Sequence, residues 1–218
     1  MSVKKLTPEL LVQAYSQGVF PMADTATSDE VFWVEPKMRG VMPLDGFHIS
    51  RSLGRALRNC GYEITLNKNF PAVMAACADR PETWINPMIT NAYVDFHERG
   101  LAHSVEVWNG EELVGGVYGV ALNAAFFGES MFSHVKNGSK IALTHLVNQL
   151  NATGFKLFDT QFITPHLASM GGQEIPQSAF LVSLDDALAH PADISSRPLI
   201  NPYGQGYSGS AQDSNQTS

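Results

Sequence analysis

The sequence predicts an α/β fold in which a mixed β-sheet is flanked by helices. Strand-like and helical segments alternate through most of the chain, and two tight turns join three consecutive strands in its middle. Apolar residues make up 44% of the 218 residues, which is enough to form a sizeable core. We therefore expect one large domain with a small appendage, and helices on the faces of its sheet.

The first 35 residues are expected to form a small N-terminal domain that packs on the rest of the chain. Residues 7–18 have the pattern of a helix, because Thr7 can cap it, Pro8 suits its first turn and Gly18 ends it. An aromatic strand follows at residues 31–36. We place the larger domain at residues 36–190.

Local signals place most elements of the larger domain. Ser50 can cap a helix over residues 51–60, the Asn-Gly pair at 109–110 is a strong hairpin signal, and Asn123 marks a second hairpin. Residues 191–218 are rich in Gly, Ser, Gln and Asn, and we expect a disordered tail there. The other predicted elements are strands at 62–70, 102–108, 113–122, 124–132 and 155–163, helices at 70–80, within 81–100 and at 137–154, a loop at 164–176 and a short terminal helix.

Composition excludes several classes of protein. There is no run of about 20 apolar residues that could span a membrane, and the N-terminus lacks the apolar centre of a signal peptide. Cys60 and Cys77 form no disulfide framework and no CxxC motif, and the seven histidines show no zinc-binding spacing. We expect a cytoplasmic protein that needs no metal and no cofactor.

Basic residues concentrate in one part of an otherwise acidic chain. The net charge is −7, which argues against general coating of nucleic acid, yet residues 36–80 hold seven basic and three acidic residues. Arg51, Arg55 and Arg58 share one face of the predicted helix and have no acidic partner on it. They form either a patch that binds a polyanion or an ordinary solvated helix face.

The candidate chemistry lies in two segments. The apolar stretch Gly115–Ser133 contains one carboxylate, Glu129, which is costly to bury without partners. In the strand LFDTQF, Asp159 and Gln161 leave the same face, with Phe158 and Phe162 on the opposite one. The alternatives are a half-exposed glutamate at a strand end, and a polar pair that hydrogen-bonds the backbone of the following loop.

Several motifs together resemble the leucyl/phenylalanyl-tRNA–protein transferase family. They are AYSQGVFPM, HISRSL, TWINPMITNAYVDFHERGLAHSVEVW, LVGGVYGV, FFGESMFS, SKIAL, DTQF and H-ASMGGQEIP, in this order over about residues 7–181. The resemblance implies an acetyltransferase-like (GNAT) domain behind a small N-terminal domain. It implies transfer of Leu, Phe or Met from aminoacyl-tRNA to the α-amine of proteins that begin with Lys or Arg, which marks them for degradation.

The resemblance also implies roles for particular residues. The family's functional positions map to Glu129, Asp159 and Gln161, and an apolar pocket would hold the transferred amino acid. Strict strand alternation would turn Phe126 away from Glu129, against its implied place in the pocket. A bulge at Gly128 would reconcile the alternation with that place. The implied pocket residues are Val117, Phe126, Met131, Leu143 and Phe158, and those at the aminoacyl-adenosine end are Tyr15 and Trp84. From the basic segment, we expect tRNA to be bound by Lys37, Arg39, Arg51, Arg55 and Arg58.

The expected reaction is the aminolysis of an activated ester, for which positioning supplies much of the acceleration. Gln161 would orient the attacking amine, Asp159 would hold or polarise the Gln161 amide, and Glu129 would attract the cationic acceptor or take a proton. We expect a monomer. The alternatives are an acyltransferase that uses acyl-CoA, an aminoacyl transferase with other acceptors, such as acidic N-termini or cell-wall peptides, and a non-catalytic module that binds tRNA or peptide.

Overall fold

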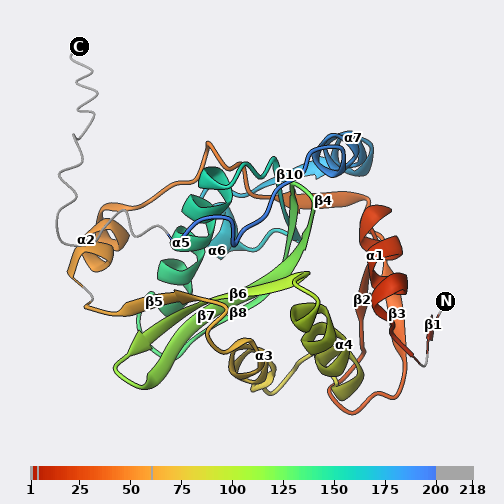
Figure 1. Cartoon of the computed structure of the whole chain (residues 1–218), viewed down its shortest axis with the longest axis horizontal. Helices are drawn as coiled ribbons and strands as arrows, with labels where there is room; N and C mark the ends of the chain where they lie inside the picture. The colour runs from red at the N-terminus through yellow and green to blue at the C-terminus, as the bar shows by residue number, and fades with distance from the viewer. Residues whose placement is uncertain (1, 4, 60, 200–218) are drawn as a thin grey trace.

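The computed structural model describes residues 2–3, 5–59 and 61–199. It contains a small three-stranded sheet and a seven-stranded sheet (Figure 1). Cys60 and residues 200–218 of the predicted tail lie outside the described residues. Within the described part of the chain, no helix has both the length and the apolar character needed to cross a membrane.

The small sheet and one helix form the N-terminal unit. Strand β3 (Val31–Val34) pairs antiparallel with β1 (Ser2–Val3) on one side and with β2 (Phe20–Met22) on the other. The predicted helix is confirmed as α1 (Pro8–Ser16), and the Thr7 hydroxyl accepts a hydrogen bond from Leu10 N–H at 3.3 Å. The buried side chains of this unit join the core of the larger sheet, so the two share one hydrophobic cluster.

The seven-stranded sheet has the order β10-β4-β9-β8-β7-β6-β5. Only β8 and β9 pair in parallel, and the other neighbours are antiparallel, so the predicted mixed sheet is confirmed. Both predicted hairpins are present, joining β6 to β7 and β7 to β8. The bounds are β4 (Met38–Val41), β5 (Glu63–Leu66), β6 (Ala102–Asn109), β7 (Glu112–Leu122), β8 (Ala125–Ser133), β9 (Leu157–Gln161) and β10 (Gln173–Pro176).

Helices cover both faces of this sheet, as predicted (Figure 1). On one face α5 (Gly138–Ala152) packs across β6, β7 and β8, and α2 (Arg51–Asn59) packs on α5. On the other face lie α3 (Phe70–Ala78), α4 (Pro87–Glu98) and the N-terminal unit. Ser50 caps α2 as predicted, since its hydroxyl accepts from Leu53 N–H at 3.2 Å. Two separate apolar clusters therefore fill the two faces.

The segment after β9 differs from the prediction of a loop. It contains the short helix α6 (Pro165–Ala168) and the edge strand β10, which pairs with β4 and leads into α7 (Gln177–Leu188). The predicted disordered tail also begins too early. Ile194 is 0% exposed, and Gln149 Nε2 donates to the carbonyl oxygens of Ile194 and Arg197 at 2.7 and 3.0 Å.

Candidate functional site

Strand β8 carries a bulge that displaces Glu129 from the regular ladder. Gly128 pairs with Gly119 and Ser130 pairs with Tyr118, so Glu129 is the extra residue between them. The bulge reverses the strand alternation. Phe126 before it and Met131 after it consequently belong to the α5 face, as the predicted bulge requires.

Glu129 is 8% exposed and accepts three side-chain hydrogen bonds. Its Oε1 accepts from Tyr15 Oη at 2.7 Å and from Gln161 Nε2 at 2.8 Å, and its Oε2 accepts from Tyr93 Oη at 3.3 Å. Burial raises the pKa of Glu129 to about 7, while the hydrogen bonds from Tyr15 and Gln161 oppose the rise. The tyrosines remain donors, because burial and the Glu129 charge raise the pKa of both.

Gln161 ends β9 in an unusual backbone conformation. Its φ is +62°, and Phe162 N–H donates to Thr160 O at 2.7 Å across it, which forms a γ-turn. Gly40 pairs with Gln161, and a Cβ on Gly40 would lie only 2.7 Å from the Phe162 carbonyl carbon. The turn carries Phe162 away from the face of Phe158. Phe162 is 47% exposed and contacts Phe20 instead, so its predicted orientation is wrong.

Asp159 holds this turn from within the core. Its Oδ1 accepts from Gln161 backbone N–H at 2.8 Å, so Asp159 binds the main chain of Gln161 rather than the side-chain amide. Asp159 is 0% exposed and forms a bidentate ion pair with Arg39. Arg39 Nε donates to Oδ1 at 2.9 Å, and Arg39 Nη2 donates to Oδ2 at 2.6 Å. Burial raises the pKa of Asp159, and the Arg39 guanidinium opposes that rise.

The prediction that Arg39 binds tRNA is therefore wrong. Its side chain is 1% exposed and its charge is compensated by Asp159, so it offers nothing to an external phosphate. The alternative in which Asp159 hydrogen-bonds the following loop is also not found. The predicted polar cluster itself is present, since Asp159, Gln161 and Glu129 are joined by successive hydrogen bonds.

An apolar cavity lies beside Glu129 on the α5 face. Its volume is about 70 Å³. Strands β8 and β9 pair only between residues 125–127 and 157–159, and the cavity opens where this pairing has ended. Four of the five predicted pocket residues line it, and Phe126 does not, because it packs edge-on behind Phe158 at 5.6 Å. The lining residues are Val117, Gly128, Glu129, Ser130, Met131, Leu143, Phe158, Thr160 and Leu167.

The two residues predicted at the adenosine end occupy different places. Tyr15 is buried behind Glu129. Trp84 lines a larger cavity of about 740 Å³ between residues 22–27 of the N-terminal unit and residues 81–84. Among the described residues, no three His, Cys, Asp or Glu side chains gather into a metal site.

The predicted basic residues do not all lie together. Arg51, Arg55 and Arg58 are exposed on α2, and none of them forms an ion pair within the described part of the chain. Lys37 is exposed in the segment between β3 and β4, and these two strands lie on the opposite side of the molecule from α2 (Figure 1). The patch thus consists of the three α2 arginines.

One residue of the site and one of its contacts were not identified from the sequence. Tyr93 follows the buried face of α4, and its spacing predicts only a core residue, not its hydrogen bond to Glu129. The Arg39–Asp159 pair joins residues on β4 and β9, and no local pattern signals it. Tyr15 and Tyr93 also hydrogen-bond each other through their hydroxyls.

Comparison with known proteins matches the chain to one family over most of its length. A family model described as leucyl/phenylalanyl-tRNA protein transferase matches residues 41–185, and the model of its N-terminal domain matches residues 4–37. The chain belongs to the leucyl/phenylalanyl-tRNA protein transferase family. The N-terminal model ends at residue 37, between β3 and β4, and the other begins at residue 41, the last residue of β4.

Relatives named leucyl/phenylalanyl-tRNA–protein transferase are similar along nearly their whole length. One from Ruegeria sp. (strain TM1040) is 56% identical over 90% of this chain and 94% of its own. One from Jannaschia sp. (strain CCS1) is 54% identical over 88% of this chain and 91% of its own. A solved structure, L-PGS from Bacillus licheniformis, overlaps 74% of this chain and 54% of its own with a TM-score of 0.40 and 14% identity, too low to compare folds.

Proposed function

We propose that this leucyl/phenylalanyl-tRNA protein transferase family member moves Leu, Phe or Met from aminoacyl-tRNA to the α-amine of proteins that begin with Lys or Arg. The new N-terminal residue would mark the acceptor protein for degradation. The observation that carries the proposal is the buried Glu129–Gln161 pair at the edge of an apolar cavity. Family membership supplies the aminoacyl-tRNA donor.

The cavity would hold the side chain of the transferred amino acid. Its apolar walls, from Val117, Met131, Leu143, Phe158 and Leu167, favour an apolar side chain over a polar one. Hydrophobic pockets discriminate by about 1–3 kcal/mol per methylene-sized difference, so Leu, Phe and Met could share the site. The flexible Met131 side chain suits a site that accepts more than one shape.

Transfer requires the acceptor amine to attack the ester carbonyl carbon. A C–N bond forms, the C–O bond to the ribose breaks, and the ribose oxygen takes up a proton. Because Gln161 Nε2 donates to Glu129, the amide is oriented with its oxygen as the remaining acceptor. We propose that this oxygen accepts a hydrogen bond from the attacking amine and directs its lone pair to the ester.

Glu129 would supply the negative charge that attracts the acceptor and the group that accepts its proton. Its carboxylate attracts a cationic acceptor, and with a pKa of about 7 it can take the proton that the amine loses. The α-amine has a pKa of about 7.7–8.0, so a useful fraction is already neutral near pH 7. The enzyme therefore needs mainly to position the amine and to remove one proton.

We also propose that the larger sheet is of the acetyltransferase-like type. This is supported by its single parallel strand pair, β8 and β9, which separates at a bulge beside the cavity. In this arrangement the donor would enter the opening between the two strands. The acyl-CoA alternative has less support, since no glycine-rich phosphate loop precedes a helix in the sequence.

The α2 arginines would hold tRNA phosphates without reading sequence. Affinity for Leu-tRNA should fall as salt rises, by about 0.7–0.9 log units per log unit of salt for each phosphate neutralised. The R51A/R55A/R58A variant should bind more weakly, with a salt slope smaller by about 2–3. Binding is measured at 50–200 mM salt. Arg99→Ala, an exposed arginine at the end of α4, is the control, and an unchanged slope in the triple variant would remove α2 from tRNA binding.

The donor and acceptor are tested directly. Purified protein is incubated with Leu-, Phe- or Met-tRNA and with peptides that begin with Lys, Arg, Asp or Glu, and the products are weighed by mass spectrometry. We expect additions of Leu, Phe and Met to the Lys and Arg peptides alone. Modification of the Asp and Glu peptides instead would favour an aminoacyl transferase with other acceptors. No product with any pair would refute the proposed function.

A further inference from the structure

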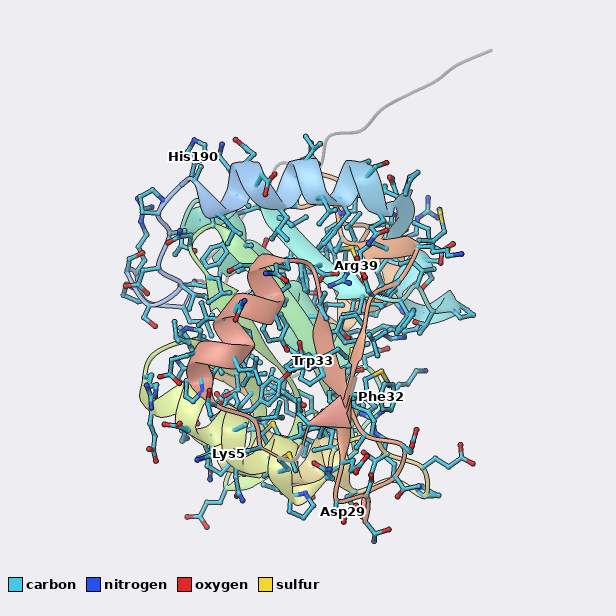
Figure 2. The ribbon with its side chains drawn as sticks, turned by 90° about the vertical axis from the view of Figure 1, so that its right-hand side faces the viewer. Lys5, Asp29, Phe32, Trp33, Arg39 and His190 are labelled. Atoms are coloured by element: carbon cyan, nitrogen blue, oxygen red, sulfur yellow. The ribbon has the colours of Figure 1, made fainter. Side chains whose placement is uncertain are left out.

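Arg39 is 1% exposed and is the only lysine or arginine that is buried among the described residues. Figure 2 shows it beneath α7, at the upper end of the N-terminal unit. Its guanidinium makes cation–π contacts with the rings of Phe20 and Phe180, at 4.8 and 4.5 Å from their centroids. Two aromatic rings thus pack against the guanidinium, and its N–H groups donate to fixed acceptors.

Those acceptors belong to two parts of the molecule. Nη1 donates to Gly18 O, just after α1 in the N-terminal unit, at 2.8 Å. Nε and Nη2 donate in parallel to the two oxygens of Asp159. A bidentate pair fixes the carboxylate plane as well as its position, which a single ammonium group does not.

Asp159 in turn fixes the backbone at the end of β9, where Gln161 lies. Its Oδ1 accepts from the Gln161 backbone N–H, and that bond supports a γ-turn at a non-glycine residue with φ of +62°. Such conformations cost about 1–3 kcal/mol and persist only when the surroundings impose them. The Gln161 side chain then reaches Glu129 from this turn.

We propose that Arg39 is a positioning residue for transfer, and that it fixes the catalytic Gln161 amide through Asp159. This rests on the proposed function for the rate of transfer, although the coupling between Arg39 and Gln161 can be observed without it. The same contacts tie the N-terminal unit to the reacting residues. A shift of Gly18 or Phe20 would move Arg39, and with it the turn at Gln161.

The test uses Arg39→Lys, which keeps the charge and loses the planar fork. A displacement of reacting groups by about 1 Å can cost about 100-fold in rate. We expect kcat for transfer of Leu to a Lys peptide to fall by about this factor, with KM for Leu-tRNA within twofold of wild type. The backbone amide signal of Gln161 should also shift in the ¹H–¹⁵N NMR spectrum, because its hydrogen bond to Asp159 changes.

Ile194→Ala is the matched control, since Ile194 is 0% exposed and its loss opens a cavity in the core without removing any of the contacts of Arg39 named above. It should lower thermal stability while keeping kcat and the Gln161 signal. If Arg39→Lys does not fold, Phe180→Leu loosens one side of the stack and should give the same changes in smaller degree. A folded Arg39→Lys with wild-type kcat and an unshifted Gln161 signal would overturn the proposal. Absence of transfer by wild type would refute the proposed function, and the NMR shift would still decide the role of Arg39.

Discussion

Replacing Gln161 by glycine should lower the rate of transfer by about 100-fold or more without a matching loss of stability. A positioned hydrogen-bonding group that acts in the transition state contributes about 10²–10³ in rate. Glycine removes the amide that bonds Glu129, and it adopts the left-handed backbone at φ of +62° without the strain of a side chain. We therefore expect Gln161→Gly to lower the transfer rate while the free energy of unfolding changes little.

The comparison with Gln161→Ala isolates the backbone contribution. Both variants lose the bond to Glu129, but alanine keeps the Cβ that makes the left-handed conformation cost about 1–2 kcal/mol. The glycine variant should be more stable than the alanine variant by about 1 kcal/mol in urea unfolding, and both should be equally poor in single-turnover transfer.

Asn123→Gly is the control for relief of backbone strain. Asn123 is exposed in the β7–β8 hairpin and has φ of +51°, so glycine there relieves a similar strain away from the cavity. Its transfer rate should equal that of wild type. Wild-type transfer by Gln161→Gly would contradict the role proposed for the side-chain amide.

Most of the fold was predictable because its signals are local. Helix α1 has its cap and its first-turn proline adjacent in sequence, and both hairpins have their turn residues between the strands they join. The exceptions are α6 and β10. Strand β10 exists through its pairing with β4, far earlier in the chain, and no local pattern reports that partner.

The candidate site was predictable as a set of residues but not as a network. Glu129, Asp159 and Gln161 stand out as polar groups in apolar strands, and the structure joins them. Arg39 was grouped with the tRNA-binding residues because it lies in the basic segment at residues 36–80. Its partner Asp159 is remote in sequence, so the pair becomes visible only when β4 and β9 lie side by side.

Phe162 illustrates how one dihedral angle changes such predictions. Regular alternation places Phe162 on the face of Phe158, whereas the turn at Gln161 moves it against Phe20 of the N-terminal unit. The same turn directs Gln161 to Glu129. A conformation that the sequence pattern does not encode therefore changes where the side chain after Gln161 lies.

The stability of the protein should depend on pH through Glu129. The pKa of Glu129 is about 7 in the folded protein and 4.5 in the unfolded chain, so between these values the folded state holds a proton that the unfolded state has lost. The free energy of unfolding therefore falls as pH rises through this window, by about 3 kcal/mol in total. Glu129→Gln has no titrating group at this position, and relative to wild type it should gain about 2.5 kcal/mol between pH 5 and pH 8.

Urea unfolding at pH 5, 6, 7 and 8 measures this difference in the free energy of unfolding. The contributions of the other titrating groups cancel in the difference, because both proteins contain them. Glu98 is an exposed glutamate on α4, and the free energy of unfolding of Glu98→Gln should vary with pH in parallel with that of wild type. Parallel curves for Glu129→Gln and wild type would contradict the raised pKa. The wild-type transfer rate should rise over the same interval, because the Glu129 carboxylate and the neutral amine both become more abundant. The fold would thus be least stable in the pH range in which its buried carboxylate is ready to accept the proton.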